Sequence, residues 1–309
     1  MTNLTLKQLR YFEALARQRH FGRAAETCAI SQPALSMQIR ELEATLGAPL
    51  FERGAREVRL TALGQDFAVR SREILRAVDE LAELARAARE RLAGRLRLGV
   101  IPTVAPYLLP AIASGLTLHC PGLELQLRET VTPRLLRELA DGRLDTAVVA
   151  LPVSEPALTE VALFAEEFVL VRPEADAGKP VPDRAQLREM RLLLLEEGHC
   201  FRDQALSFCD IQSARPRELM DGSSLATLVQ MVGAGIGVTL IPEMAVPVET
   251  RSAKVTVARF APPQPQRTIG MVWRRTSPLA RQLQEVAEVV RAAAGGLRSG
   301  SDTAGDAPA

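Results

Sequence analysis

The sequence predicts an α/β domain that follows an all-helical N-terminal domain and a long connecting helix. Three observations carry this prediction. The first 60 residues alternate short helical patterns with tight breaks, residues 61–92 form one uninterrupted helical pattern, and strand-like runs alternate with helical ones after Gly94. With 309 residues, 47% of them hydrophobic and 24% charged, the chain has the composition of an ordinary globular protein.

The N-terminal residues predict three short helices in close succession. Apolar residues in 4–17 have the spacing of one buried helical face, and residues 21–28 supply a second helix. Ser31 followed by Pro33 is a typical helix start and Gly47 a typical helix stop, which bounds the third helix. Two short helices separated by a tight break form a helix-turn-helix, the core of many DNA-binding domains.

The third helix has two faces of different character. Leu35, Ile39 and Leu42 line one face, whereas the opposite face is small or polar and free of acidic residues. That pattern is also typical of a solvent-exposed amphipathic helix, but glutamine and serine reach base edges and arginine contacts phosphate or guanine. Further arginines follow in a segment suited to a β-wing, where guanidinium groups bind phosphates. The predicted DNA-binding residues are Gln32, Pro33, Ser36, Arg40, Arg53 and Arg56.

Residues 61–92 predict a helix that pairs with a second copy. The segment contains no proline and a single glycine, Gly64. Its apolar residues recur mostly at alternating four- and three-residue spacing, a narrow strip typical of a coiled-coil seam. A homodimer formed through this helix would prefer a two-fold symmetric site on double-stranded DNA. The strip consists of Phe67, Ile74, Val78, Leu81, Ala85, Ala88 and Leu92.

The remaining chain predicts an α/β fold. Strand-like runs occupy residues 96–101, 123–127, 146–151, 168–171, 192–195, 237–241 and 268–273, and helical patterns occupy 133–140, 224–232 and 279–294. We therefore expect a DNA-binding domain at 1–60, a linker helix at 61–93, an effector domain at 94–295 and a disordered tail at 296–309. Four cysteines are too few for a disulfide scaffold, and neither a signal peptide nor a membrane segment is predicted, which favours a cytoplasmic protein.

Taken together, these residues resemble the LysR-type transcriptional regulators. The resemblance covers nearly all of the chain and implies a winged helix-turn-helix and a two-lobed effector domain like that of periplasmic binding proteins. Lobe one would comprise about 95–165 plus 267–295. It also implies promoter DNA, RNA polymerase and a homotetramer as partners, a nucleoid-associated location, and no enzymatic activity, cofactor or metal. The matching string is Ala24-Ala25, Ile30-Ser31-Gln32-Pro33-Ala34-Leu35-Ser36, Ile39, Leu42-Glu43, Leu46-Gly47, Leu50-Phe51, Arg53, Leu60-Thr61 and Gly64, with Leu63 a departure where alanine is common.

One segment resembles the peroxide-sensing branch of that family. Residues 198–209 read GHCFRDQALSFC, and residues 101–110 and 267–270 strengthen the match. By this resemblance Cys200 reacts with hydrogen peroxide, Cys209 resolves the product as a reversible disulfide, and a thiol reductant resets the pair, so that oxidative-stress genes are controlled. The implied peroxide pocket consists of Thr103, Thr132, His199, Asp203 and Arg267.

The spacing of the two thiols is consistent with a switch. If the segment is helical, nine steps from Cys200 to Cys209 rise about 13 Å and place the side chains on opposite faces. A disulfide needs Cα atoms about 4.4–6.8 Å apart, so bridging must unwind the segment. The start of a helix beside Arg202 and His199 would offer positive potential that lowers the pKa of Cys200.

Other interpretations of the cysteines remain open. The chain could be a metabolite-responsive regulator with passive thiols, or a thiol peroxidase with a DNA-binding head; sustained peroxide turnover would favour the latter. His119-Cys120 and His199-Cys200 lack the close paired-ligand spacing of structural zinc sites. A tyrosine-phosphatase loop would need arginine where Leu206 stands. Cys28 and Cys120 are expected to be packing residues.

Overall fold

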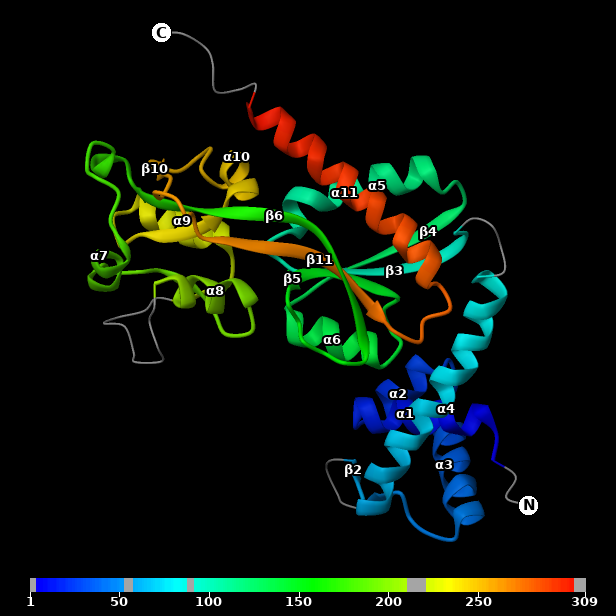
Figure 1. The fold of residues 1–309 in the computed structure, drawn as a ribbon. Helices are drawn as coiled ribbons and strands as arrows, with labels where there is room; N and C mark the ends of the chain where they lie inside the picture. Colours follow the sequence, from blue (N-terminus) through cyan, green and yellow to red (C-terminus); the bar gives the residue numbers. More distant parts are fainter. Residues whose placement is uncertain (1–3, 53–57, 88–91, 210–220, 303–309) are drawn as a thin grey trace. The chain divides into compact units, whose positions relative to one another are not determined.

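The computed structural model describes residues 4–52, 58–87, 92–209 and 221–302 (Figure 1). They belong to two compact units, Met1–Ala85 and Arg86–Ala309, which are described separately. Among the helices in these ranges, none combines the length and hydrophobicity that crossing a membrane requires.

The N-terminal unit is a winged helix-turn-helix, as predicted. Three helices, α1 (Leu6–Gln18), α2 (Phe21–Thr27) and α3 (Gln32–Leu46), precede a short antiparallel wing of β1 (Phe51–Glu52) and β2 (Arg59–Leu60). The predicted boundaries of α3 have the expected chemistry. The Ser31 side chain accepts a hydrogen bond from the Ala34 amide, and Gly47 ends the helix at φ 73°, a conformation that favours glycine. The core packs Phe12, Leu15, Leu35 and Leu42 at the centre.

The predicted pairing strip is exposed only in the middle part of helix α4 (Ala62–Ala87). Phe67 packs against Phe12 at 4.9 Å between ring centroids, and therefore belongs to the helix-turn-helix core. Ile74 and Leu81 are 48% and 64% exposed, as residues awaiting a partner helix would be. Leu92 was expected on the same strip, but it is buried in the core of the effector unit, because the chain has left the helix by that point. The side chain of Ala85 and the whole of Ala88 lie outside the described residues.

The effector unit is organised around two strands that run from one lobe to the other (Figure 1). Strand β6 (Leu158–Pro173) pairs through its first part with β11 (Gln266–Arg274) and through its last part with β9 (Thr239–Pro242) and β10 (Val255–Ala258). The change of partners falls at Glu167 and Phe168, which marks the boundary between the lobes.

Lobe one contains the parallel strands β4 (Leu123–Glu129), β3 (Gly94–Val100) and β5 (Thr146–Leu151), in that spatial order, with β11 antiparallel beside β5. Its helices are α5 (Ala105–His119), α6 (Thr132–Ala140) and α11 (Ala280–Asp302). Helices α5 and α11 approach closely, since a Cβ added at Gly115 would lie 2.9 Å from a methyl group of Val289.

Lobe two has its own hydrophobic core, in which Phe168, Leu193, Val229 and Ile241 are fully or almost fully buried. Its remaining elements are η1 (Glu174–Asp176), α7 (Arg184–Glu189), β7 (Leu194–Leu195), α8 (Cys200–Phe208), β8 (Asp221–Gly222), α9 (Leu225–Gly233), η2 (Glu243–Ala245) and α10 (Val246–Glu249). Two separate cores joined by β6 and β11 confirm the predicted two-lobed effector fold.

Several elements differ from the sequence expectation: α7, α10, β8 and β10 were not predicted, and β6 is much longer than the predicted strand at 168–171. Two further differences concern α5 and the C-terminal helix. Helix α5 was not predicted, because Pro106 and Pro110 are helix breakers in most contexts; the first stands in the opening turn, where proline is tolerated, and the second lies within the helix. The predicted disordered tail began at residue 296, whereas α11 extends to Asp302. The helix continues through Gly295, Gly296 and Gly300, although glycine is a poor helix former. Residues 303–309 lie outside the described part.

Candidate redox site and DNA interface

The exposed face of α3 contains the predicted DNA-reading residues. Gln32, Pro33 and Arg40 are exposed and Ser36 is half-buried, while Leu35 on the opposite face is fully buried. The two faces are therefore arranged as the sequence predicted. Arg53 and Arg56, the predicted phosphate contacts of the wing, lie outside the described residues.

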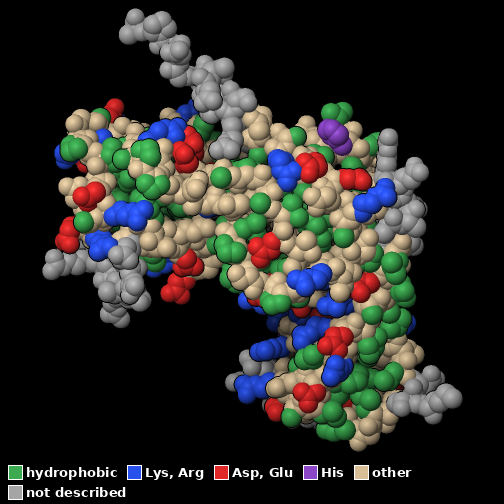
Figure 2. All heavy atoms as spheres, in the orientation of Figure 1, with side chains coloured by type: hydrophobic (Ala, Val, Ile, Leu, Met, Phe, Trp, Pro, Cys, Tyr) green, Lys and Arg blue, Asp and Glu red, His purple; other side chains and the backbone are tan. Residues whose placement is uncertain are grey.

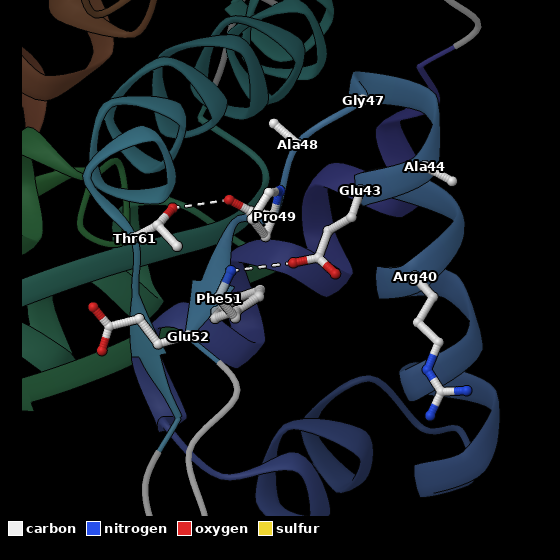
Figure 3. Close-up of a pocket in the computed structure, with 9 residues that line it drawn as sticks. All are labelled: Arg40, Glu43, Ala44, Gly47, Ala48, Pro49, Phe51, Glu52 and Thr61. Carbon is white, nitrogen blue, oxygen red and sulfur yellow. Dashed lines mark hydrogen bonds between the residues drawn. The ribbon is translucent and has the colours of Figure 1, made fainter.

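Glu43 fixes the wing to α3, a role that the sequence did not reveal. Its carboxylate points from α3 toward the wing and accepts hydrogen bonds from the amides of Leu50 at 2.8 Å and Phe51 at 3.1 Å (Figure 3). A groove lies between α3 and the wing, and Glu43 and Thr61 both line it. The Thr61 hydroxyl donates to the Pro49 carbonyl at 2.9 Å. Arg40 lies one turn earlier on α3 and turns away from the wing strands (Figure 3). The Glu43 hydrogen bonds therefore fix the position of the wing relative to α3.

The two candidate redox cysteines lie at the two ends of α8. Cys200 is its first residue and Cys209 caps its C-terminus, and both are free thiols. Cys200 is half-buried and packs against the core of lobe one, whereas Cys209 is fully buried in the core of lobe two. The helix that the spacing argument assumed between them is present, so the thiols lie at opposite ends of α8.

Two threonines lie at the edge of the lobe-one sheet that the start of α8 approaches. Thr103 follows β3 and Thr132 begins α6 after β4, and because β3 and β4 are parallel neighbours, both residues lie at the same edge of the sheet. The start of α8 approaches this edge: a Cβ added at Gly198 would lie 3.6 Å from Val131. Thr103 is buried, and Thr132 Oγ1 is buried with no hydrogen-bond partner among the described residues.

Arg267 is held in a fully buried network beside this edge. It is the cross-strand partner of Glu166 where β6 passes between lobes, and its Nε donates to the Glu166 carboxylate at 2.7 Å. Its Nη1 donates to Thr103 Oγ1 at 2.8 Å and its Nη2 to the Thr103 carbonyl at 3.1 Å. The guanidinium also lies over the ring of Phe201, 5.4 Å from the centroid. Arg267 thereby links the crossing strands, the Thr103 loop and α8.

The groups next to Cys200 differ electrostatically from the expectation. Burial lowers the pKa of His199, although Glu196 acts in the opposite direction, so the imidazole is neutral at pH 7. His199 therefore supplies a hydrogen-bonding group and no positive charge. The Arg202 guanidinium donates to the Leu195 carbonyl at 2.8 Å. Asp203 is exposed in the first turn of α8, where an acidic side chain is favoured, and is not enclosed with the threonines.

The environment of Cys209 keeps its thiol protonated. Burial raises the pKa of Cys209 to about 11, although the guanidinium groups of Arg188 and Arg184 act to lower it. Arg188 Nε also donates to the Cys209 carbonyl at 2.8 Å. In the described part of the chain, no group of three or more His, Cys, Asp or Glu side chains is arranged to hold a metal ion.

Sequence reasoning missed Glu166, Phe201 and Arg188. Glu166 lies before the predicted strand at 168–171, and only the register of β6 with β11 shows that it faces Arg267. Arg188 is one of several surface-type arginines in the sequence. Its link to α8 depends on how α7 packs, which no local pattern encodes.

Comparison with known proteins identifies the class. Residues 6–65 match the helix-turn-helix model of the lysR family of bacterial regulatory proteins, and residues 89–295 match the LysR substrate binding domain. The chain therefore belongs to the LysR family of transcriptional regulators.

Within this family the chain is similar to OxyR proteins. It is 44% identical over 94% of both chains to a probable hydrogen peroxide-inducible genes activator of Streptomyces viridosporus. It is 43% identical to the DNA-binding transcriptional dual regulator OxyR of Escherichia coli, over 94% of this chain and 95% of the relative. A solved structure of a Corynebacterium glutamicum OxyR cysteine mutant with H2O2 bound is 34% identical, with a TM-score of 0.68, over 98% of this chain and 97% of that one.

Proposed function

We propose that this chain is a peroxide-sensing transcriptional activator that binds promoter DNA and is switched by a reversible Cys200–Cys209 disulfide. The observation that carries the proposal is the position of the two free thiols at opposite ends of α8, each packed against a different lobe. Similarity to hydrogen peroxide-inducible activators supports peroxide as the signal. A disulfide between these positions would require α8 to rearrange, which couples oxidation to shape.

In the proposed reaction the Cys200 thiolate attacks one peroxide oxygen and the O–O bond breaks. The other oxygen leaves with a proton as water, and Cys200 is oxidised to a sulfenic acid. Cys209 then loses its thiol proton and its sulfur attacks the Cys200 sulfur, so that the S–S bond forms and the S–O bond breaks. The leaving hydroxide takes up that proton and departs as a second water. A thiol reductant returns two electrons and two protons to reset the pair.

The hydrogen bonds of Thr103 suit its hydroxyl to donate a hydrogen bond to peroxide. Because Arg267 already donates to Thr103 Oγ1, the threonine hydrogen is directed elsewhere and can point toward a peroxide oxygen. Thr132 Oγ1 offers a second buried hydroxyl, which has no hydrogen-bond partner among the described residues. Neutral His199 can accept or donate, and Arg267 would stabilise negative charge that develops on the leaving oxygen. Asp203 would join this pocket only if α8 moved.

The N-terminal unit would present α3 to the major groove, with Gln32 and Ser36 at base edges and Arg40, Arg53 and Arg56 at phosphates. Exposed Ile74 and Leu81 support dimerisation through α4. We further propose the division into a DNA-binding domain at 1–60, a linker at 61–93 and an effector domain at 94–295. A homotetramer, contact with RNA polymerase and association with the nucleoid belong to the same proposal.

Mass mapping of thiols after stoichiometric peroxide tests the switch. We expect a Cys200–Cys209 linkage in the wild-type chain, no response in Cys200→Ser, and a trapped sulfenic acid on Cys200 in Cys209→Ser. Cys120→Ser is the matched control, since Cys120 packs against the lobe-one core away from α8. If no linkage between the two cysteines appears, the proposed switch is refuted, and the alternative of a metabolite-responsive regulator with passive thiols is favoured.

A further inference from the structure

Two arginines of α7 contact the C-terminal end of α8. Arg188 Nε donates to the Cys209 main-chain carbonyl at 2.8 Å. The Arg184 guanidinium lies over the Phe208 ring, 4.8 Å from its centroid, and the same ring packs edge-on against Phe260 at 5.1 Å. These contacts hold the backbone of the last helical turn, in addition to the burial of the Cys209 side chain.

We propose that Arg188 is a positioning residue for the resolving cysteine: it holds Cys209 at the end of intact α8 and thereby raises the midpoint potential of the Cys200–Cys209 pair. The inference rests on the proposed disulfide switch and deepens it. Arg188 itself touches neither peroxide nor a sulfur atom in this role; it acts through the main chain of Cys209.

The direction of the effect follows from the geometry. Nine helical steps separate the cysteines by about 13 Å, and a disulfide allows about 6.8 Å at most between Cα atoms. If the Cys209 end moves, its carbonyl must leave Arg188, and a hydrogen bond from a charged donor to a helix-end carbonyl is lost. Arg188 therefore stabilises the dithiol relative to the disulfide. A pair whose reduced form is stabilised is the more strongly oxidising one.

The charge of Arg188 cannot produce the same shift at neutral pH. With Arg188 present, the pKa of Cys209 is about 11, and its removal would raise the pKa further. The thiol is protonated at pH 7 in both cases, so the number of protons taken up on reduction by Cys209 does not change. A change in potential at pH 7 thus reports the position of Cys209 and not its ionisation.

The test measures the equilibrium of the full-length chain with reduced and oxidised dithiothreitol at pH 7, with the disulfide quantified by thiol mass mapping. We expect Arg188→Ala to increase the equilibrium constant for disulfide formation about tenfold, which corresponds to a midpoint potential about 30 mV lower. Arg188→Lys keeps a charged donor and should stay within about threefold of the wild type. Arg184→Ala should shift the constant in the same direction by a smaller factor.

Arg172→Ala is the matched control. Its guanidinium also donates to main-chain carbonyls of lobe two, those of Pro180 and Ala177, but not to α8. An unchanged constant in Arg188→Ala would overturn the inference and place the movement at the Cys200 end. An equal shift in Arg172→Ala would also overturn it, because general loosening of lobe two would then suffice. Absence of the disulfide in the wild-type chain would instead refute the proposed function itself.

Discussion

Replacing Glu166 with alanine would leave the buried guanidinium of Arg267 without its counter-charge. The Arg267 side chain is fully inaccessible and that of Glu166 is 5% exposed. Glu166 also accepts a hydrogen bond from the Met244 amide in lobe two at 3.3 Å. Removal of one partner of a buried ion pair costs about 3–5 kcal/mol, since the remaining charge keeps its desolvation penalty. We expect Glu166→Ala to lower the free energy of unfolding of the effector unit by that amount.

The chain offers a convenient probe for this measurement. Trp273 is the single tryptophan and is buried in lobe one, so its fluorescence during urea unfolding reports on the effector unit. Glu167→Ala is the matched control. Glu167 is the next residue on β6, but it is 37% exposed and pairs with the exposed Arg259 at 3.6 Å, so its removal should cost less than about 1 kcal/mol.

A second variant separates the charge from the packing. Glu166→Met combined with Arg267→Met removes both charges and should recover part of the lost stability, because an apolar replacement of a buried pair is often neutral. The reasoning is refuted if Glu166→Ala unfolds at the same urea concentration as Glu167→Ala. That result would mean that solvent or another group compensates Arg267 in the folded chain.

Three further predictions concern the thiol, the pocket and the DNA-binding face. Between pH 9 and 11 the unfolded chain loses the Cys209 proton while the folded chain keeps it, so this thiol should lower stability by about 2–3 kcal/mol over that range. Cys209→Ser should remove this share of the slope in urea titrations, and the Tyr107 hydroxyl, whose pKa burial also raises, supplies part of what remains. Thr132→Val removes a buried hydroxyl that has no partner in the described part of the chain, and it should raise stability by up to about 1 kcal/mol. The same variant should slow Cys200 oxidation in stopped-flow assays at least tenfold. Equal oxidation rates in variant and wild type would exclude Thr132 from the pocket. Gln32→Ala should reduce the preference for matched over scrambled DNA, whereas Arg53→Ala should weaken binding to both. If Gln32→Ala lowers the affinity for matched and scrambled DNA equally, direct readout of bases by Gln32 is contradicted.

Local patterns were sufficient to predict the helices of the N-terminal unit, whereas the helix between the thiols was only assumed. Ser31 and Gly47 bound α3 because capping is decided by a few adjacent residues, and the apolar spacing of α3 identified its buried face. The same local reasoning failed for α5, where Pro110 lies inside a helix that lobe-one packing stabilises. Leu92 continued the helical spacing but belongs to the next core, since spacing alone does not mark the end of a helix.

The network around Arg267 could not be predicted from residue patterns, although family resemblance pointed to Arg267 itself. More than 100 residues separate Glu166 from Arg267, and 164 separate Thr103 from Arg267. Their contact depends on the register of β6 with β11, which is set by both lobes together. Nor could the spacing of residues show that His199 is neutral, because burial and not sequence neighbours lowers its pKa.

The same contacts indicate where oxidation should change the effector unit. Arg267 and Glu166 join the crossing strands through buried charge-assisted hydrogen bonds, and the Tyr107 hydroxyl donates to Glu249 at 2.6 Å between α5 and α10. Disruption of the Glu166–Arg267 pair would lower the free energy of unfolding by about as much as the most destabilising single substitutions do. The last turn of α8 is held by the partly buried contacts of Arg188 and Arg184. Rearranging this turn therefore costs less free energy than separating the crossing strands. We therefore expect disulfide formation to remodel α8 while the crossing strands keep their register, and hydrogen exchange at the β6–β11 amides should be the same in both redox states.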